Sequence, residues 1–139
     1  MAAASYQSGE KLYSQFTGTW EYGRETERID HTEILLPPNA PREYADRETL
    51  WNAVDAAETG ENAQTARRLI IALPKELTLE QNIALIRRYC QTTFVDKGMI
   101  ADIAVHHSLP ARSSGTNTNP SYSDGIILTM KSEMALSVA

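Results

Sequence analysis

The sequence predicts an α+β fold, in which helices pack on a mostly antiparallel central sheet. Segments that favour strands and helices follow one another without strict alternation, and one segment has the pattern of a hairpin. The stretch from Thr65 to His107 predicts a strand, a helix and a second strand in succession. The chain has 139 residues with no internal repeat, so residues 1–139 are interpreted as a single domain with one core.

The first third of the chain predicts a helix and two strands. Ala2–Tyr13 is rich in alanine and short polar residues, which favours a helix with Tyr6 near its middle, although Gly9 weakens it. Phe16–Tyr22 predicts a turn at Thr17-Gly18 and then a short aromatic strand. His31–Leu36 predicts a strand that ends at two prolines.

A second helix is predicted after Asp46, whose carboxylate can cap the first turn. The helix is expected to end near Gly60. Its apolar face consists of Leu50, Trp51, Val54 and Ala57.

The central unit begins with Arg68–Leu73, an apolar run of branched residues that suits a buried strand. Thr78 and Gln81 have the spacing of a capping box, which predicts where the following helix begins. Spacings of three and four place one apolar stripe on this helix. The stripe consists of Leu79, Ile83, Ile86, Cys90 and Phe94.

Ile100–His106 predicts the next strand. Because side chains alternate between the faces of a strand, His106 should lie on the face opposite Ile103 and Val105. Ile126–Met130 is the last predicted strand.

Composition limits the classes of function. The net charge of −5 argues against a broadly basic nucleic-acid surface, but a local patch could still contact phosphates. The candidates for such phosphate contacts are Arg67, Arg68, Arg87, Arg88 and Arg112. Arginines of this kind more commonly belong to an ordinary solvated charged surface. Cys90 is the single cysteine, which excludes an internal disulfide. No apolar run is long enough for a membrane span, and the start lacks the pattern of a signal peptide, so a cytoplasmic protein is expected.

Tyr6 is the first residue that could carry chemistry. A tyrosine hydroxyl can attack phosphorus, but it is a weak nucleophile near neutral pH because its pKa is roughly 10. It therefore needs a metal or a base. The alternative, favoured by position alone, is a half-buried aromatic residue that anchors a helix.

The histidines are the other candidates. His106 and His107 are adjacent, so only one of them can enter a given site on a strand. His31 lies on another predicted strand, and Asp124 is the nearest carboxylate to the last one. Three or more converging ligands are usually needed for a metal, so the pair alone is weak evidence for one.

Five segments together resemble the MobA/MobL family of plasmid mobilisation relaxases. They are AAASYQSGEKLY at Ala2–Tyr13, HTEILLPPNAP at His31–Pro41, LWNAVDAAE at Leu50–Glu58, ARRLIIALPKELTLEQ at Ala66–Gln81, and IADIAVH at Ile100–His106. Two of these segments, HTEILLP and ALPKELT, are specific when they occur in this order.

The resemblance implies a palm-like antiparallel sheet and an enzyme that nicks and rejoins one DNA strand at a plasmid transfer origin. By position, Tyr6 matches the family's nucleophile, which forms a phosphotyrosine, and His106 matches the first metal-binding histidine. A divalent metal (Mg or Mn), single-stranded DNA and relaxosome accessory proteins are implied in the same way. No membrane partner is implied.

The chain also departs from the family pattern. The family has an H-x-H after Asn-Pro, where this chain has Ser121-Tyr122-Ser123, which predicts poor metal affinity. The family also has a strand before the nucleophile helix, so a first strand is expected to be missing and the domain to be partial. Three hypotheses follow: a nicking relaxase, a non-catalytic remnant that binds single-stranded DNA or relaxosome proteins, and a poorly folding pseudogene product.

Overall fold

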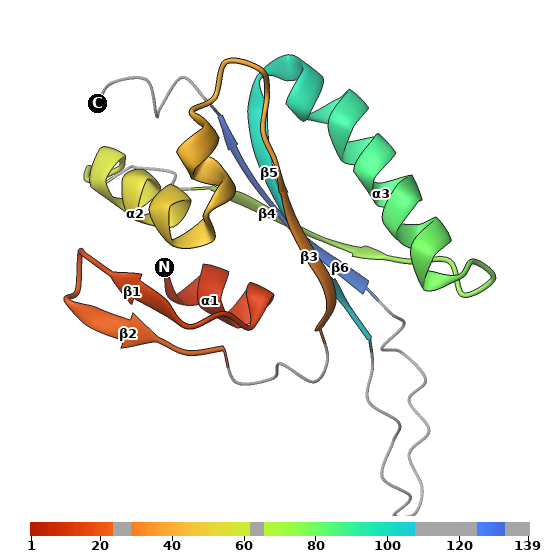
Figure 1. Cartoon of the computed structure of the whole chain (residues 1–139), viewed down its shortest axis with the longest axis horizontal. Helices are drawn as coiled ribbons and strands as arrows, with labels where there is room; N and C mark the ends of the chain where they lie inside the picture. Colours follow the sequence, from red (N-terminus) through yellow and green to blue (C-terminus); the bar gives the residue numbers. More distant parts are fainter. Residues whose placement is uncertain (24–28, 62–65, 108–124, 133–139) are drawn as a thin grey trace, which may run out of the picture.

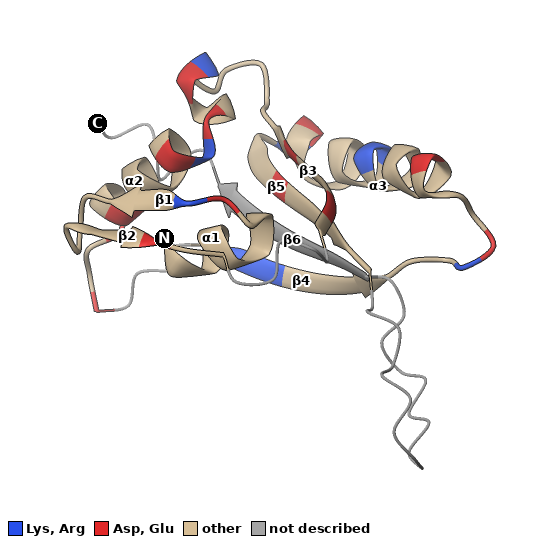
Figure 2. Cartoon of the chain, turned by 60° about the horizontal axis from the view of Figure 1, so that its bottom comes forward, with Lys and Arg blue, Asp and Glu red and all other residues tan. Residues whose placement is uncertain are grey.

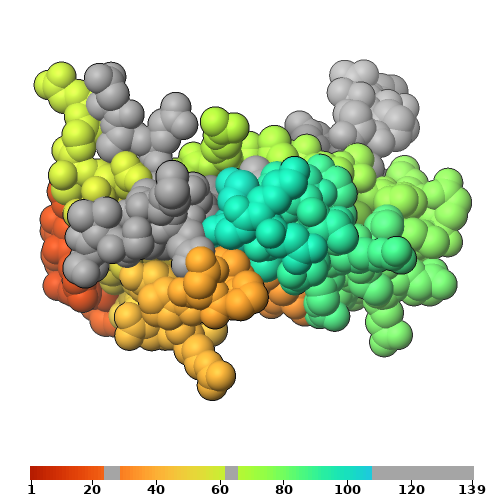
Figure 3. All heavy atoms as spheres, turned by 90° about the horizontal axis from the view of Figure 1, so that it is seen from above, coloured from red at the N-terminus to blue at the C-terminus, as the bar shows by residue number. Residues whose placement is uncertain are grey.

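The computed structural model describes residues 1–23, 29–61, 66–107 and 125–132. A four-stranded sheet lies between helix α3 on one side and helices α1 and α2 on the other, with a small β1–β2 hairpin beside α1 (Figure 1). This arrangement confirms the predicted α+β class. Seen from above, the N-terminal elements and α3 occupy opposite ends of the molecule (Figure 3). Within the described residues, no helix combines the length and apolarity that crossing a bilayer requires.

The sheet has the strand order β3-β5-β6-β4, and every neighbouring pair is antiparallel. Its strands are β3 (Ile29–Leu35), β4 (Arg67–Ala72), β5 (Met99–His106) and β6 (Gly125–Ser132). The predicted strands at 31–36, 100–106 and 126–130 are therefore confirmed to within two residues at each end.

The prediction that Arg68–Leu73 is a buried strand was wrong in one respect. The segment is extended as β4, but this strand forms an edge of the four-stranded sheet, and Ile70 is 73% exposed. Only Leu73, just beyond the strand, is buried in the core. Branched residues favour an extended backbone, but the burial of a strand depends on which elements cover it.

Helix α3 spans Leu79–Thr93 and begins as predicted. The Gln81 backbone N–H donates to Thr78 Oγ1 at 3.2 Å, and the Thr78 N–H donates to Gln81 Oε1 at 3.0 Å. Ile86 and Cys90 are buried against the sheet. Leu79 is exposed, contrary to its place in the predicted stripe, because contact with the core begins one turn later. A short 3-10 helix, Val95–Lys97, then leads into β5.

The first predicted helix is shorter than expected. Helix α1 spans Ala2–Ser8 and ends at Gly9, whose φ of 74° is left-handed and interrupts the helix. The next residues form an antiparallel hairpin of β1 (Leu12–Ser14) and β2 (Thr19–Glu21). The aromatic strand was predicted, whereas its partner β1 was not.

Helix α2 spans Arg47–Ala57 and follows a 3-10 helix at Arg42–Ala45. Asp46 caps it as predicted, since its carboxylate accepts a hydrogen bond from the Thr49 N–H at 3.0 Å. Leu50, Trp51 and Val54 are buried on its inner face, whereas Ala57 is exposed.

Strand β5 separates two apolar clusters. Ile103 and Val105 belong to the cluster under α3, whereas Ile100 belongs to the cluster under α1 and α2. The alternation predicted for this strand is therefore confirmed, and it directs Asp102 and His106 toward α1 and α2.

Candidate active site

The end of β5 meets the last turn of α1. His106 Nε2 lies 2.8 Å from the backbone oxygen of Gln7, the residue after Tyr6. A carbonyl oxygen can only accept, so His106 Nε2–H is the donor of this hydrogen bond. The two residues selected from the sequence, Tyr6 and His106, therefore belong to elements that touch each other.

Tyr6 is held on a well-anchored turn. Its neighbours Ser5 and Gln7 are buried, whereas Tyr6 itself is 42% exposed. Ser5 Oγ donates to the Glu10 backbone oxygen at 2.6 Å, and Gln7 Nε2 donates to the Asp102 backbone oxygen at 3.3 Å. The side chain of Tyr6 is thus accessible on a backbone that is fixed from both sides.

A buried ion pair lies beneath this turn. Arg47 Nε contacts Asp102 Oδ1 and Oδ2 at 3.1 and 3.0 Å, and Arg47 Nη2 contacts Oδ1 at 2.8 Å. Trp51 Nε1 donates to Oδ2 at 2.9 Å. The side chains of Asp102 and Arg47 are 0% and 5% exposed, and Arg47 also pairs with Glu10 just after α1. The pair therefore joins β5, α2 and the end of α1.

The charges of this network support one another. Burial by itself lowers the pKa of Arg47, but the hydrogen bonds and the charges of Asp102 and Glu10 outweigh burial and raise it. No pattern noted in the sequence predicts this network. The available signal was Asp102, the only charged residue within the apolar strand β5, because buried carboxylates are normally paired.

The other histidines point elsewhere. His31 lies opposite Val105 on the α3 side of the sheet, and its Nε2 is 3.6 Å from Glu33 Oε2. His107 Nδ1 lies 2.9 Å from Asp30 Oδ1. Neither of them converges with His106.

The described residues do not fit a metal site. No group of three or more His, Cys, Asp or Glu side chains comes together among them. His106 is one imidazole whose Nε2 is already bonded to a carbonyl. The other candidates, Ser121, Ser123 and Asp124, lie outside the described residues.

The predicted arginines do not form one patch. Arg67 and Arg68 are exposed on the edge strand β4, whereas Arg87 is exposed on α3 and binds Glu33 (Figure 2). Arg112 lies outside the described residues. A phosphate backbone would therefore meet scattered cations rather than a basic surface.

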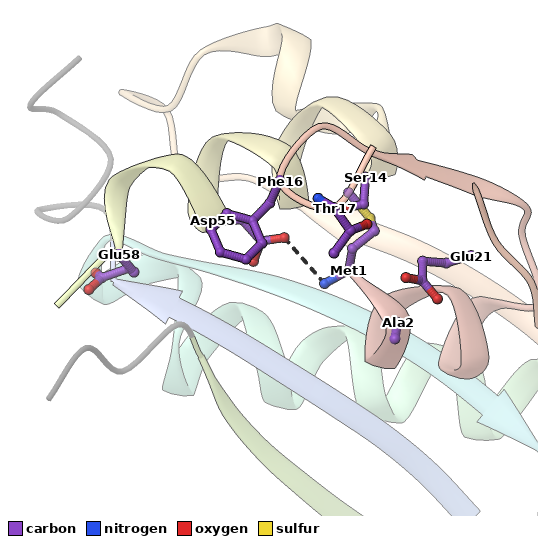
Figure 4. A pocket seen from close by; sticks show the side chains of 8 residues that line it. All are labelled: Met1, Ala2, Ser14, Phe16, Thr17, Glu21, Asp55 and Glu58. Atoms are coloured by element: carbon purple, nitrogen blue, oxygen red, sulfur yellow. Dashed lines mark hydrogen bonds and ion pairs between the residues drawn. The ribbon is translucent and has the colours of Figure 1, made fainter. Parts of the chain in front are cut away.

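A pocket of about 360 Å³ opens at the other end of α1, where Met1 and Ala2 line it together with residues of β1, β2 and α2. It carries the carboxylates of Glu21, Asp55 and Glu58 (Figure 4). These charges disfavour a phosphodiester, so the pocket is not a candidate for binding nucleic acid.

Comparison with solved structures supports the fold. A structure described as "Molecular Basis of Vancomycin Resistance Transfer in Staphylococcus aureus" superimposes with a TM-score of 0.73 and 28% identity, covering 93% of this chain and 59% of that one.

Curated relatives agree with the structural comparison. The probable mobilization protein MobA of Bifidobacterium longum is 35% identical over 120 residues, which cover 86% of this chain and 20% of the relative. The conjugal transfer protein TraA of Agrobacterium fabrum is 41% identical over 115 residues, 75% of this chain and 10% of the relative. The mobilization protein MobL of Acidithiobacillus ferridurans is 35% identical over 105 residues, 75% of this chain and 27% of the relative. This chain thus spans about a quarter or less of these three relatives.

The family comparison covers nearly the whole sequence. Residues 1–129 match the model of the MobA/MobL family, which confirms the resemblance found in the five segments. The chain belongs to the MobA/MobL family, whose relatives are named as mobilisation and conjugal transfer proteins.

Proposed function

We propose that this chain acts as a mobilisation relaxase that nicks and rejoins one DNA strand at a plasmid transfer origin, with Tyr6 as the nucleophile. The observation that carries the proposal is the contact between His106 Nε2 and the Gln7 oxygen. It sets an imidazole against the turn that presents Tyr6 to solvent. Membership of the MobA/MobL family, whose relatives are named as mobilisation and conjugal transfer proteins, supports this proposal.

The proposed step is an in-line phosphoryl transfer. Tyr6 Oη forms a bond to phosphorus, the bond from phosphorus to the 3′ oxygen breaks, and the phenol proton is finally carried by that 3′ hydroxyl. The 5′ end stays joined to Tyr6 as a phosphotyrosine. Attack by a 3′ hydroxyl reverses the step and rejoins the strand. Such a reaction depends mainly on positioning and on neutralising charge.

The arrangement around Tyr6 suits positioning. The bonds from Gln7 to Asp102 and from His106 to Gln7 hold α1 against β5. His106 is the imidazole proposed to assist Tyr6, because its ring contacts the turn that carries this residue. No step of the proposed reaction passes through a metal, because the described residues do not form a metal site.

The test is nicking of a supercoiled plasmid that carries the cognate transfer origin, with Mg²⁺, with Mn²⁺ and with a chelator. Relaxed plasmid with protein joined to the 5′ end is expected, and Tyr6→Phe should abolish it. Tyr89→Phe is the matched control, since Tyr89 is similarly exposed but lies on α3. Absence of nicking at every metal concentration, by a chain that melts cooperatively, would contradict the proposal.

A second function has its own support. Serines stand where the family has its H-x-H, and the described residues contain no metal cluster, which favours a non-catalytic chain that binds single-stranded DNA or relaxosome proteins. It predicts salt-sensitive oligonucleotide binding that survives a chelator and leaves the DNA uncut. Loss of binding at low salt would exclude the DNA-binding form of this function.

A further inference from the structure

The hairpin after α1 carries aromatic rings on its solvent side. Its strands pair Tyr13 with Trp20 and Leu12 with Glu21. Leu12 and Ser14 are buried, so the residues that alternate with them face outward. We call this set the aromatic face; it consists of Lys11, Tyr13, Trp20 and Tyr22.

The aromatic face is ordered by its own contacts. The rings of Tyr13 and Trp20 meet edge to face with centroids 5.2 Å apart. Lys11 Nζ lies 4.5 Å from the Trp20 centroid and 5.0 Å from the Tyr22 centroid. Trp20 and Tyr22 nevertheless remain 49% and 61% exposed. A cluster of exposed rings on a two-stranded ribbon indicates a binding surface.

This face begins next to the turn that carries Tyr6. A Cβ atom on Gly23 would lie 2.5 Å from the Ser5 oxygen and 2.6 Å from Gly9 Cα, so the chain after β2 lies directly on the end of α1. Lys11 follows Gly9 by two residues. The end of α1 and the start of the aromatic face are therefore adjacent in the fold.

We propose that the aromatic face is a stacking platform for unpaired bases of the DNA strand that reaches Tyr6, an inference that rests on the proposed function. Aromatic rings stack on any base whose faces are free, and such stacking does not depend on sequence. Lys11 supplies a cation for the neighbouring phosphate. Because the chain has a net charge of −5, stacking must contribute much of its affinity.

Two of the nearby carboxylates lie away from the aromatic face or are paired, and Glu48 accepts a hydrogen bond from the Tyr13 backbone N–H at 2.8 Å. Glu21 lies opposite Leu12 on the other side of the hairpin and lines the acidic pocket (Figure 4). Glu10 is paired with Arg47. A base-paired duplex keeps its base faces stacked inside the helix, so the platform should select single strands.

The test measures binding of oligo(dT) of about ten nucleotides to the Tyr6→Phe chain, which cannot cleave it. Trp20→Ala and Tyr22→Ala should each raise the Kd roughly 5- to 150-fold. Trp20→Phe should restore most of the affinity, because a ring remains. The matched control is Phe16→Ala, which removes a 78% exposed ring from the same hairpin but on the acidic pocket, and it should leave the Kd unchanged.

Two further measurements separate stacking from charge. Oligo(dT) should quench the emission of Trp20 but not that of buried Trp51, so quenching should disappear in Trp20→Phe. Lys11→Gln should flatten the slope of log K against log salt by about 0.7. An abasic oligonucleotide of equal length should bind weakly, since it offers phosphates without bases.

The platform and the nicking proposal fail in different ways. Tight binding that is insensitive to Trp20→Ala and Tyr22→Ala, or equal affinity for the abasic strand, would overturn the platform whether or not the plasmid is nicked. Quenching of Trp20 with no nicking under any condition would keep the platform and reject the nuclease. Melting curves of each variant show that a loss of binding is not a loss of folding.

Discussion

Replacing Arg47 by methionine is expected to lower the free energy of unfolding by about 3–5 kcal/mol. The substitution removes the only cation that contacts Asp102, a side chain with 0% exposure, and leaves the Trp51 N–H as its remaining side-chain donor within the described residues. A buried carboxylate without its cation has lost its hydration, and its remaining contacts in the folded chain do not compensate for that loss. This is why breaking the pair should cost more than the pair itself contributes.

The geometry fixes the size of the effect. Three Arg47–Asp102 contacts between 2.8 and 3.1 Å make the pair bidentate, so both charges are well compensated in the native chain. If Asp102→Asn is added to Arg47→Met, the neutral amide can still accept from Trp51. The double variant should therefore be more stable than Arg47→Met alone by about 2 kcal/mol, since a buried amide costs less than an unpaired carboxylate.

The assay is equilibrium unfolding in urea, followed by tryptophan fluorescence and fitted with a common slope. Arg87→Met is the matched control. Arg87 binds Glu33 through contacts of 2.9 to 3.1 Å, with nearly the same geometry, but the arginine is exposed. It should change the free energy of unfolding little, because solvent screens the pair. Equal losses for Arg47→Met and Arg87→Met would refute the argument that burial sets the cost.

Three other outcomes are expected. Gly23→Ala should destabilise the chain by about 1–3 kcal/mol in thermal melts, because the new Cβ would meet the Ser5 backbone at 2.5 Å; an unchanged Tm would contradict that contact. Burial raises the pKa of the Cys90 thiol to about 11, so iodoacetamide at pH 8 should modify it only after unfolding in urea, and rapid native labelling would argue against burial. Hydrogen bonds from Thr49 lower the pKa of Asp46. Asp46→Ala should therefore lower the free energy of unfolding by about 0.5–2 kcal/mol at pH 7, and this difference should shrink below about pH 4, where the wild-type carboxylate is protonated. Asp46→Asn should retain most of the stability.

Local signals in the sequence predicted much of the secondary structure. The capping pair Thr78 and Gln81 located the start of α3, and the alternation within Ile100–His106 identified the two faces of β5. These features depend on bonds between residues three apart or on the period of the backbone itself, so the sequence contains them directly. The exposure of β4 was missed because it depends on which strands and helices cover that edge.

The sequence predicted which residues belong to the candidate site, but it did not predict the contacts that they make. Tyr6 and His106 were selected by resemblance, and their roles stay predictions. The bond from His106 to Gln7 spans 99 residues of sequence, and the Arg47–Asp102 pair spans 55. No local pattern specifies such partners.

The sequence by itself determined where helices begin, which face of β5 is apolar, and which family the chain belongs to. Only the tertiary structure decided that Asp102 is paired with Arg47, that His31 and His107 point away from His106, and that the aromatic face lies beside the turn of Tyr6. The physical reason is the separation along the sequence over which each interaction acts. Caps and alternation act within a few residues, whereas ion pairing and burial depend on distant segments that meet only when the sheet has formed.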